Sequence, residues 1–191
     1  MKRTIIALTA LVVAATLIPL ASAALIKGTA QPDTLTGTSA RDYIHGYGGD
    51  DVISGSGGRD YVWAGAGGDE VTGNGGRDRV WGGSGTDMVN GGNGADIWVS
   101  GGPGNDIVNG GAGNDRVFGN PGNDTVNGGG GNDVIAGGHG NDILDGGIGD
   151  DRVWGGPGPD TITCGAGTDT AYARPGDTVS GDCERRIPAN A

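Results

Sequence analysis

The chain has 191 residues, of which 45 are glycine, and only 35% of them are hydrophobic and 5% aromatic. This apolar share would not fill a conventional globular core, and so much glycine is also found in disordered chains. The formal net charge of −11 argues against nucleic-acid binding through phosphate groups and favours binding of cations.

Residues 1–23 are predicted to form a secretory signal peptide. Lys2 and Arg3 give the charged start, residues 5–20 are largely apolar, and residues 21–23 read Ala-Ser-Ala, a small-residue cleavage site. The alternative is an uncleaved membrane anchor, which the short apolar run disfavours. We therefore expect a secreted, extracellular protein that has no membrane span once the leader is removed.

The rest of the chain repeats one nine-residue phrase, which is clearest over residues 101–142. Counted from its first glycine, positions 1, 2 and 4 are mostly glycine, position 6 is aspartate and position 8 is apolar. Glycine accepts the positive φ of a tight turn, aspartate supplies an anionic oxygen, and positions 7–9 suit a short strand with position 8 facing inward. So regular a period argues against disorder, and glycine does not recur at the three-residue spacing of collagen.

The position-6 aspartates recur every nine residues, with one inserted residue between Asp96 and Asp106: they are Asp33, Asp42, Asp51, Asp60, Asp69, Asp78, Asp87, Asp96, Asp106, Asp115, Asp124, Asp133, Asp142, Asp151, Asp160 and Asp169. The predicted inward residues follow two places later: Leu35, Ile44, Ile53, Val62, Val71, Val80, Val89, Val108, Val117, Val126, Ile135, Leu144, Val153 and Ile162. Most are β-branched, which suits a thin core between two sheets.

Residues 24–42 form a degenerate start to the repeats. Ile26 and Gly28 keep the register, but Ala24 replaces the aspartate and residues 37–42 have lost most of their glycines. We predict an N-terminal cap over residues 24–42 and regular repeats over residues 43–170, because repeat folds need a cap over their open end.

The insertion after Asp96 allows two registers. Counted from upstream, Trp98 faces inward, whereas counted from downstream Val99 does. Tryptophan is too bulky for a place that elsewhere holds valine, so we favour Val99 inward with a β-bulge nearby.

Residues 171–191 are predicted to form a C-terminal cap and tail. Residues 173–177 are one short of a full phrase, and residues 178–180 give a last strand. The two cysteines, Cys164 and Cys183, lie about one coil apart, and paired cysteines in an exported protein are usually bonded. We predict a disulfide that closes this cap.

The phrase GGxGxDx-apolar-x resembles the RTX, or hemolysin-type, calcium-binding nonapeptide repeat, over nearly all of the chain after the leader. The resemblance implies an all-β parallel β-roll, a solenoid with 18 residues and two short strands per coil. Alternate aspartates would then line opposite edges of the roll. The N-terminal leader departs from RTX proteins that carry a C-terminal export signal.

The resemblance also implies several Ca²⁺ ions, each held by position-6 carboxylates and by carbonyls of positions 1–4 from two stacked turns. Ca²⁺ accepts about 6–8 such oxygens, whereas Mg²⁺ and Zn²⁺ suit them less. We expect the chain to be largely disordered without Ca²⁺ and to fold on binding it. The expected ligands are Asp51, Asp60, Asp69, Asp78, Asp87, Asp96, Asp106, Asp115, Asp124, Asp133, Asp142, Asp151, Asp160 and Asp169, with Gly101, Gly102, Gly104, Gly110, Gly111, Gly113, Gly128, Gly129, Gly137 and Gly138.

Positions 7 and 9 point outward, and alternate phrases separate two faces. One face carries aromatic and arginine side chains, which include Tyr61, Trp63, Arg79, Trp81, Arg116, Phe118, Arg152 and Trp154. The other is small and polar, with a row of Asn90, Asn109 and Asn127. Rows of like residues stabilise neighbouring strands, but aromatic and arginine side chains are also typical interface anchors.

Three functions are compatible with this pattern. The first is a non-enzymatic, exported calcium-binding roll with a structural or surface role. The second is a module that uses the aromatic and arginine face to bind carbohydrate, such as cell-wall polysaccharide, or another protein. The third, a hydrolase or epimerase, is disfavoured because the sequence contains no G-x-S-x-G, H-E-x-x-H or Walker motif.

Overall fold

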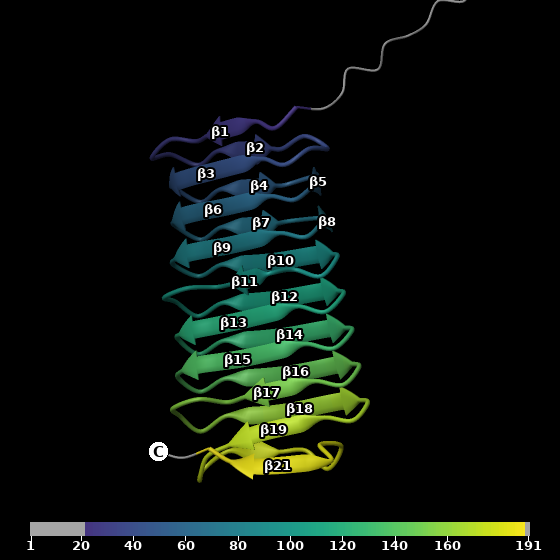
Figure 1. The fold of residues 1–191 in the computed structure, drawn as a ribbon. Helices are drawn as coiled ribbons and strands as arrows, with labels where there is room; N and C mark the ends of the chain where they lie inside the picture. The colour runs from purple at the N-terminus through teal and green to yellow at the C-terminus, as the bar shows by residue number, and fades with distance from the viewer. Residues whose placement is uncertain (1–21, 190–191) are drawn as a thin grey trace, which may run out of the picture.

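The computed structural model describes residues 22–189 as a stack of coils in which two parallel sheets enclose a narrow core (Figure 1). The predicted leader lies outside the described residues except for Ser22 and Ala23. The chain passes from one sheet to the other and back, so that each strand pairs in parallel with the strand one coil later, as Ile44 does with Val62. These features confirm the predicted parallel β-roll. Residues 22–189 include no helix with the length and apolar character needed to cross a bilayer.

The two sheets alternate along the chain. Sheet A consists of β1 (Leu25–Lys27), β3 (Tyr43–Gly48), β6 (Tyr61–Ala66), β9 (Arg79–Ser84), β11 (Trp98–Ser100), β13 (Arg116–Pro121), β15 (Val134–His139), β17 (Arg152–Trp154), β19 (Thr170–Ala173) and β21 (Arg185–Pro188). Sheet B consists of β2 (Thr34–Thr36), β4 (Val52–Ser54), β5 (Gly57–Gly58), β7 (Glu70–Thr72), β8 (Gly75–Gly76), β10 (Met88–Asn93), β12 (Ile107–Ala112), β14 (Thr125–Gly130), β16 (Ile143–Ile148), β18 (Thr161–Ala166) and β20 (Thr178–Val179).

The core holds one position-8 side chain from each strand, as the two-residue periodicity of a strand requires. Of the predicted inward residues only Leu35, near the N-terminal end, is partly exposed; the others are buried. A valine or isoleucine that is fully buried contributes about 1.5–3 kcal/mol, so a core this thin depends on the length of the row. At the insertion, Val99 is buried and pairs with Val80 and Val117, as predicted.

The inserted residue lies between Asp96 and Trp98. The N–H of Ile97 donates to the carbonyl of Asp78, while Trp98 pairs with Arg79, so two residues occupy a place that elsewhere holds one. This is the predicted bulge, and it restores the register by Val99. Trp98 consequently lies on the outer face of sheet A, half-buried against its neighbours.

Many strands run on beyond position 9 through positions 1–3 of the following phrase, so they are longer than the sequence pattern predicted. The chain then turns at position 4, which is glycine with positive φ in every phrase from Gly49 to Gly167. Position 2 also has positive φ but is less demanding, because Tyr47 and Asn120 adopt it at φ 79° and 83°. These values lie near the left-handed region that non-glycine residues can reach.

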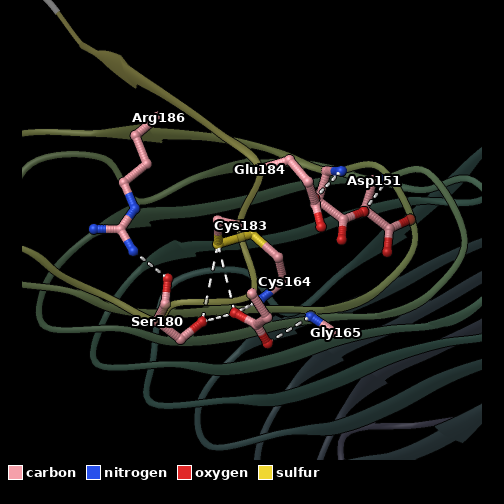
Figure 2. Close-up of a disulfide and its surroundings, with 9 residues drawn as sticks. Asp151, Cys164, Gly165, Ser180, Cys183, Glu184 and Arg186 are labelled. Atoms are coloured by element: carbon pink, nitrogen blue, oxygen red, sulfur yellow. Dashed lines mark hydrogen bonds between the residues drawn. A yellow bond between two sulfur atoms is a disulfide. The ribbon is translucent and has the colours of Figure 1, made fainter.

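The C-terminal cap contains one more strand than predicted, because β20 is followed by β21, which pairs with β19. Cys164 and Cys183 form the predicted disulfide, with their Cα atoms 5.2 Å apart. Figure 2 shows this bond, with Gly165 and Ser180 nearby. The carboxylate of Asp182 accepts hydrogen bonds from the N–H groups of Cys164 and Gly165. The disulfide and the carboxylate therefore fix the irregular last coil to the regular roll.

Loss of this disulfide is expected to lower the free energy of unfolding by about 3 kcal/mol, because the unfolded chain regains the entropy of an open loop. Urea unfolding of the Cys164→Ala, Cys183→Ala variant and of the oxidised wild type, both in excess calcium, measures the difference. Reductant should shift the wild type to the curve of the variant and leave the variant unchanged. Superimposable curves for the oxidised wild type and the variant would contradict the prediction.

Candidate calcium-binding turns

The position-6 aspartates lie in two rows, one along each edge of the roll, where the chain turns from one sheet to the other. Every one from Asp42 to Asp169 is at most 2% exposed, although aspartate is usually found at protein surfaces. Turns from sheet A to sheet B carry Asp51, Asp69, Asp87, Asp106, Asp124, Asp142 and Asp160, and turns from sheet B to sheet A carry Asp42, Asp60, Asp78, Asp96, Asp115, Asp133, Asp151 and Asp169.

One oxygen of each carboxylate belongs to a ladder that links successive coils. The backbone N–H of Asp60 donates to Oδ1 of Asp78 at 2.8 Å, and the N–H of Asp78 donates to Oδ1 of Asp96 at 2.7 Å. The same bond recurs along both rows, from Asp33 and Asp42 down to the last coil. The Oδ1 atoms therefore satisfy backbone donors that would otherwise be buried without a partner.

The other oxygen, Oδ2, is buried and has no hydrogen-bond donor from Asp51 through Asp169. It faces position 1 of its own turn, which is glycine except at Ala64 and Cys164, and a carbonyl of the next coil also approaches this place. A Cβ built on Gly55 would lie 2.7 Å from Oδ2 of Asp60 and 2.7 Å from the carbonyl oxygen of Gly73. The absence of a side chain at position 1 therefore lets two oxygens from successive coils converge.

The Oδ2 atoms and the turn carbonyls together suit a hard cation. The turn carbonyls of positions 1 and 3, such as those of Gly101 and Pro103, each accept one N–H from the preceding coil and retain a second lone pair. In residues 22–189 no three His, Cys, Asp or Glu side chains converge as a metal-binding group, so a bound ion would need these carbonyls to complete its shell. Such a mixture of carboxylate and carbonyl ligands is what Ca²⁺ accepts, and the ion would supply the positive charge that the buried Oδ2 atoms lack.

The predicted glycine ligands occupy these turns. Gly101, Gly102 and Gly104 precede Asp106, and the corresponding glycines precede Asp115, Asp133 and Asp142. At positions 2 and 4 a side chain would overlap the carbonyl group of the preceding coil, as at Gly111 and Gly113. The structure therefore requires glycine at position 4 for close stacking of the turns, whether or not each carbonyl binds an ion, whereas position 2 also holds Tyr47, Asn74 and Asn120.

Burial raises the pKa of the position-6 aspartates from Asp60 to Asp169 above the ordinary value of 3.8. The pKa of Asp124 rises to about 7, chiefly because burial penalises the charged form; the N–H of Asp106 opposes this, and repulsion from Asp106 and Asp142 adds to it. The same causes raise the pKa of Asp78 and Asp133 to about 7. A calcium-free roll therefore has many carboxyl groups that resist ionisation near neutral pH.

These pKa shifts predict that the calcium-free roll is more stable in mild acid than at neutral pH. Between about pH 4 and pH 7 the folded chain holds more protons than the unfolded chain, so the free energy of unfolding falls as the pH rises. In calcium-stripped buffer, the strand signal in circular dichroism should be larger at pH 4 than at pH 7.5, with light scattering to control for aggregation. A signal that increases with pH would contradict this. With excess calcium the signal should change little between pH 7 and pH 8.

Sequence reasoning missed three parts of the edge rows. The first is an exposed second ladder at position 5, in which the side-chain oxygen of an asparagine accepts a hydrogen bond from the backbone N–H of position 5 in the next coil. Its asparagines are Asn105, Asn114, Asn123 and Asn132. At the last coil, Asp160 donates its N–H to Asp177 and Asp169 donates to the carboxylate of Glu184. The repeated Gly-Asn-Asp sequence could have revealed the first ladder. Asp177 and Glu184 could not be found in this way, because the last coil is shortened and they fall outside the nine-residue period.

The eight residues predicted for a partner surface all lie on strands of sheet A. Their rings stack along the sheet: the ring centroids of Tyr43 and Tyr61 are 5.0 Å apart and those of Trp154 and Tyr172 are 4.3 Å apart. The guanidinium of Arg79 lies over the ring of Tyr61 and donates to its hydroxyl. These contacts stabilise the sheet, yet Trp63 remains 55% exposed.

Comparison with known protein families gave one finding. The sequence model of the RTX calcium-binding nonapeptide repeat, which contains four copies of the repeat, matches residues 27–62, 63–97, 98–126, 118–153 and 146–179. Together these stretches cover most of the chain. A comparison with curated proteins gave no match.

Proposed function

Since the chain belongs to the family of RTX calcium-binding nonapeptide repeat proteins, we propose that it is an exported protein that folds when Ca²⁺ binds between its stacked turns, and that it has a structural or surface role. The family repeat supports calcium binding as such. The proposal adds the coupling of binding to folding, the ligands in this chain and the place where the chain acts.

The observation that supports this proposal best is the double row of buried Oδ2 atoms without hydrogen-bond donors. Ionised carboxylates at successive coils repel one another, and burial without a counter-charge is costly. The fold offers little to offset that cost, because its core is one side chain thick and its many glycines lose much backbone entropy on folding. A cation between the turns would remove the repulsion, so binding and folding should be one event.

Two observations support export. The sequence begins with a predicted signal peptide, and the structure contains a disulfide, a bond that persists mainly in oxidising compartments. In addition, a protein that folds only at high calcium concentration would be kept unfolded in the cytosol and would fold outside the cell.

We propose a structural rather than an enzymatic role, because the buried carboxyl groups lie in regular rows along both edges instead of converging on one patch. A binding role for sheet A is a second candidate, which the exposed rings of Trp63 and Tyr43 favour. This second role would use the outer face of the roll and leave the turns for calcium.

Calcium titration of residues 24–191 tests the proposal, with binding measured by calorimetry and folding by circular dichroism in the same buffer. We expect strand signal to appear over the calcium range in which heat is released, and to disappear on addition of chelator. Mg²⁺ at the same concentration should give neither effect. A chain that keeps its full strand signal in excess chelator at pH 7.5 would refute the coupling of folding to calcium.

A further inference from the structure

The charges on the two outer faces of the roll are segregated by sign. Among the described strands, sheet A contains no acidic residue and sheet B contains no basic residue. The outward basic residues of sheet A are Lys27, Arg79, Arg116, Arg152 and Arg185, and the outward acidic residues of sheet B are Glu70 and Asp145. A chain with a net charge of −11 therefore presents one broad face that is positive.

The arginines of sheet A recur on every second strand, at the same register position. The paired row reads Arg79, Trp98, Arg116, Val134, Arg152, Thr170 and Arg185. Neighbouring strands are about 4.8 Å apart, so successive arginines lie about 9.6 Å apart along a straight line. Arg116, Arg152 and Arg185 are exposed.

An apolar side chain accompanies each arginine on the same strand, two residues later: Trp81, Phe118, Trp154 and Ile187. The rings form flat stacks with their neighbours, since Trp98 and Phe118 are 4.2 Å apart between centroids and inclined by 24°. Beside Arg79, the rings of Trp63 and Trp81 line a shallow depression together with Ser100 and Pro103. The ring stacks and the row of cations therefore run side by side, and Trp63 is the most exposed of the rings.

We propose that sheet A binds a linear acidic polysaccharide that carries one carboxylate or sulfate on every second sugar. Exposed rings stack on the apolar faces of sugars, and the arginine fork binds carboxylate or sulfate in a bidentate manner. Two sugar rings of an extended chain span about the same length as two strand spacings, about 9.6 Å. This inference rests on the proposed function, because the face exists only once calcium has folded the roll.

Other anionic polymers fit less well. Duplex DNA carries one charge per about 1.7 Å of its axis, far denser than one arginine per two strands, and the net charge of the chain opposes it. A protein strand would pair with a free sheet edge, whereas Arg116 and Arg152 lie on β13 and β17 inside sheet A, where backbone groups are already paired. The polysaccharide requires only a flat face with periodic charge.

Binding to immobilised hyaluronate, which has one carboxylate per disaccharide, tests the proposal with residues 24–191 in excess calcium. We expect Arg116→Gln, Arg152→Gln to weaken binding at least tenfold. The control, Arg41→Gln, Arg77→Gln, makes the same change of net charge at exposed turn positions outside sheet A and should bind like the wild type. Raising the salt concentration should weaken binding by the wild type more than by the Arg116, Arg152 variant.

Several results would overturn the proposal: no binding to hyaluronate by the folded wild type, equal loss in both arginine variants, or equal affinity for a neutral chitin oligosaccharide. Tighter binding to duplex DNA or to anionic vesicles than to hyaluronate would also overturn it and would identify another class of partner. Circular dichroism in the same buffer separates this test from that of the proposed function. If the chain folds with calcium but does not bind hyaluronate, only the present inference is refuted. If the chain stays folded in chelator, only the coupling of folding to calcium is refuted.

Discussion

Replacing Asp106, Asp124 and Asp142 together by asparagine is expected to raise the calcium concentration needed for half-folding at least tenfold. The three side chains follow one another along one edge, and each keeps the Oδ1 that accepts an N–H from the preceding coil, so the ladder of backbone hydrogen bonds can persist. Asparagine places an amide NH2 group where the anionic Oδ2 lies, and this group donates hydrogen bonds and cannot ligate a cation. Calorimetry should also show that fewer calcium ions bind per chain.

The control removes three carboxylates from the exterior, in the variant Asp50→Asn, Asp145→Asn, Asp150→Asn. None of these has a buried Oδ2 without a partner, and Asp50 and Asp150 are exposed at position 5. Its calcium midpoint should match that of the wild type within about twofold, because exposed charges are screened by salt. Equal shifts in both variants would show that calcium acts through the general negative charge and not through the position-6 aspartates.

Without calcium, the Asp106→Asn, Asp124→Asn, Asp142→Asn variant should fold more readily than the wild type, which reverses the order expected in calcium. Burial raises the pKa of Asp106, Asp124 and Asp142 because it disfavours their charged form, so neutral replacements relieve the calcium-free roll of that cost. We expect more strand signal from the variant than from the wild type in chelator at pH 7.5. This reversal of order distinguishes loss of a metal ligand from simple damage to the fold.

The fold and the two rows of aspartate could be predicted because each depends on residue type at a fixed period. Position 8 is apolar in nearly every phrase and faces the core in every regular coil, and position 6 follows from the same count. The register at Val99 could be predicted from side-chain volume alone, since a tryptophan does not fit a core in which Val80 and Val117 are the neighbours.

What the sequence left undetermined depends on contacts between coils. The roles of Oδ1 and Oδ2 differ because the backbone N–H of the preceding coil is directed at one oxygen only, and the nine-residue pattern cannot show that. Glu184 substitutes for aspartate in the last coil, where the spacing to Asp169 is shortened to 15 residues. The arginine row of sheet A was hidden for a related reason. Arg79 and Arg116 fall on the same line only because the bulge absorbs one residue between them.

Adjacent glycines in one turn provide the sharpest test of the stacking geometry. Gly131 is at position 4 with φ 121°, and a Cβ there would overlap the carbonyl group of Gly113. Gly130, at position 3, is not among the residues with positive φ, and a Cβ there would meet nothing within 4 Å. Other phrases already carry alanine, proline or histidine at position 3, so only position 4 should be sensitive to substitution.

Gly131→Ala is therefore expected to lower the free energy of unfolding by at least about 3 kcal/mol in saturating calcium, from backbone strain together with the clash between coils. Gly130→Ala should change it by less than about 1 kcal/mol and in the stabilising direction, because alanine restricts the unfolded chain. Urea unfolding followed by circular dichroism compares the two variants directly. Similar midpoints would mean that the coils are not stacked closely enough for their turn carbonyls to share one ion, and the calcium-binding arrangement proposed above would fail with them.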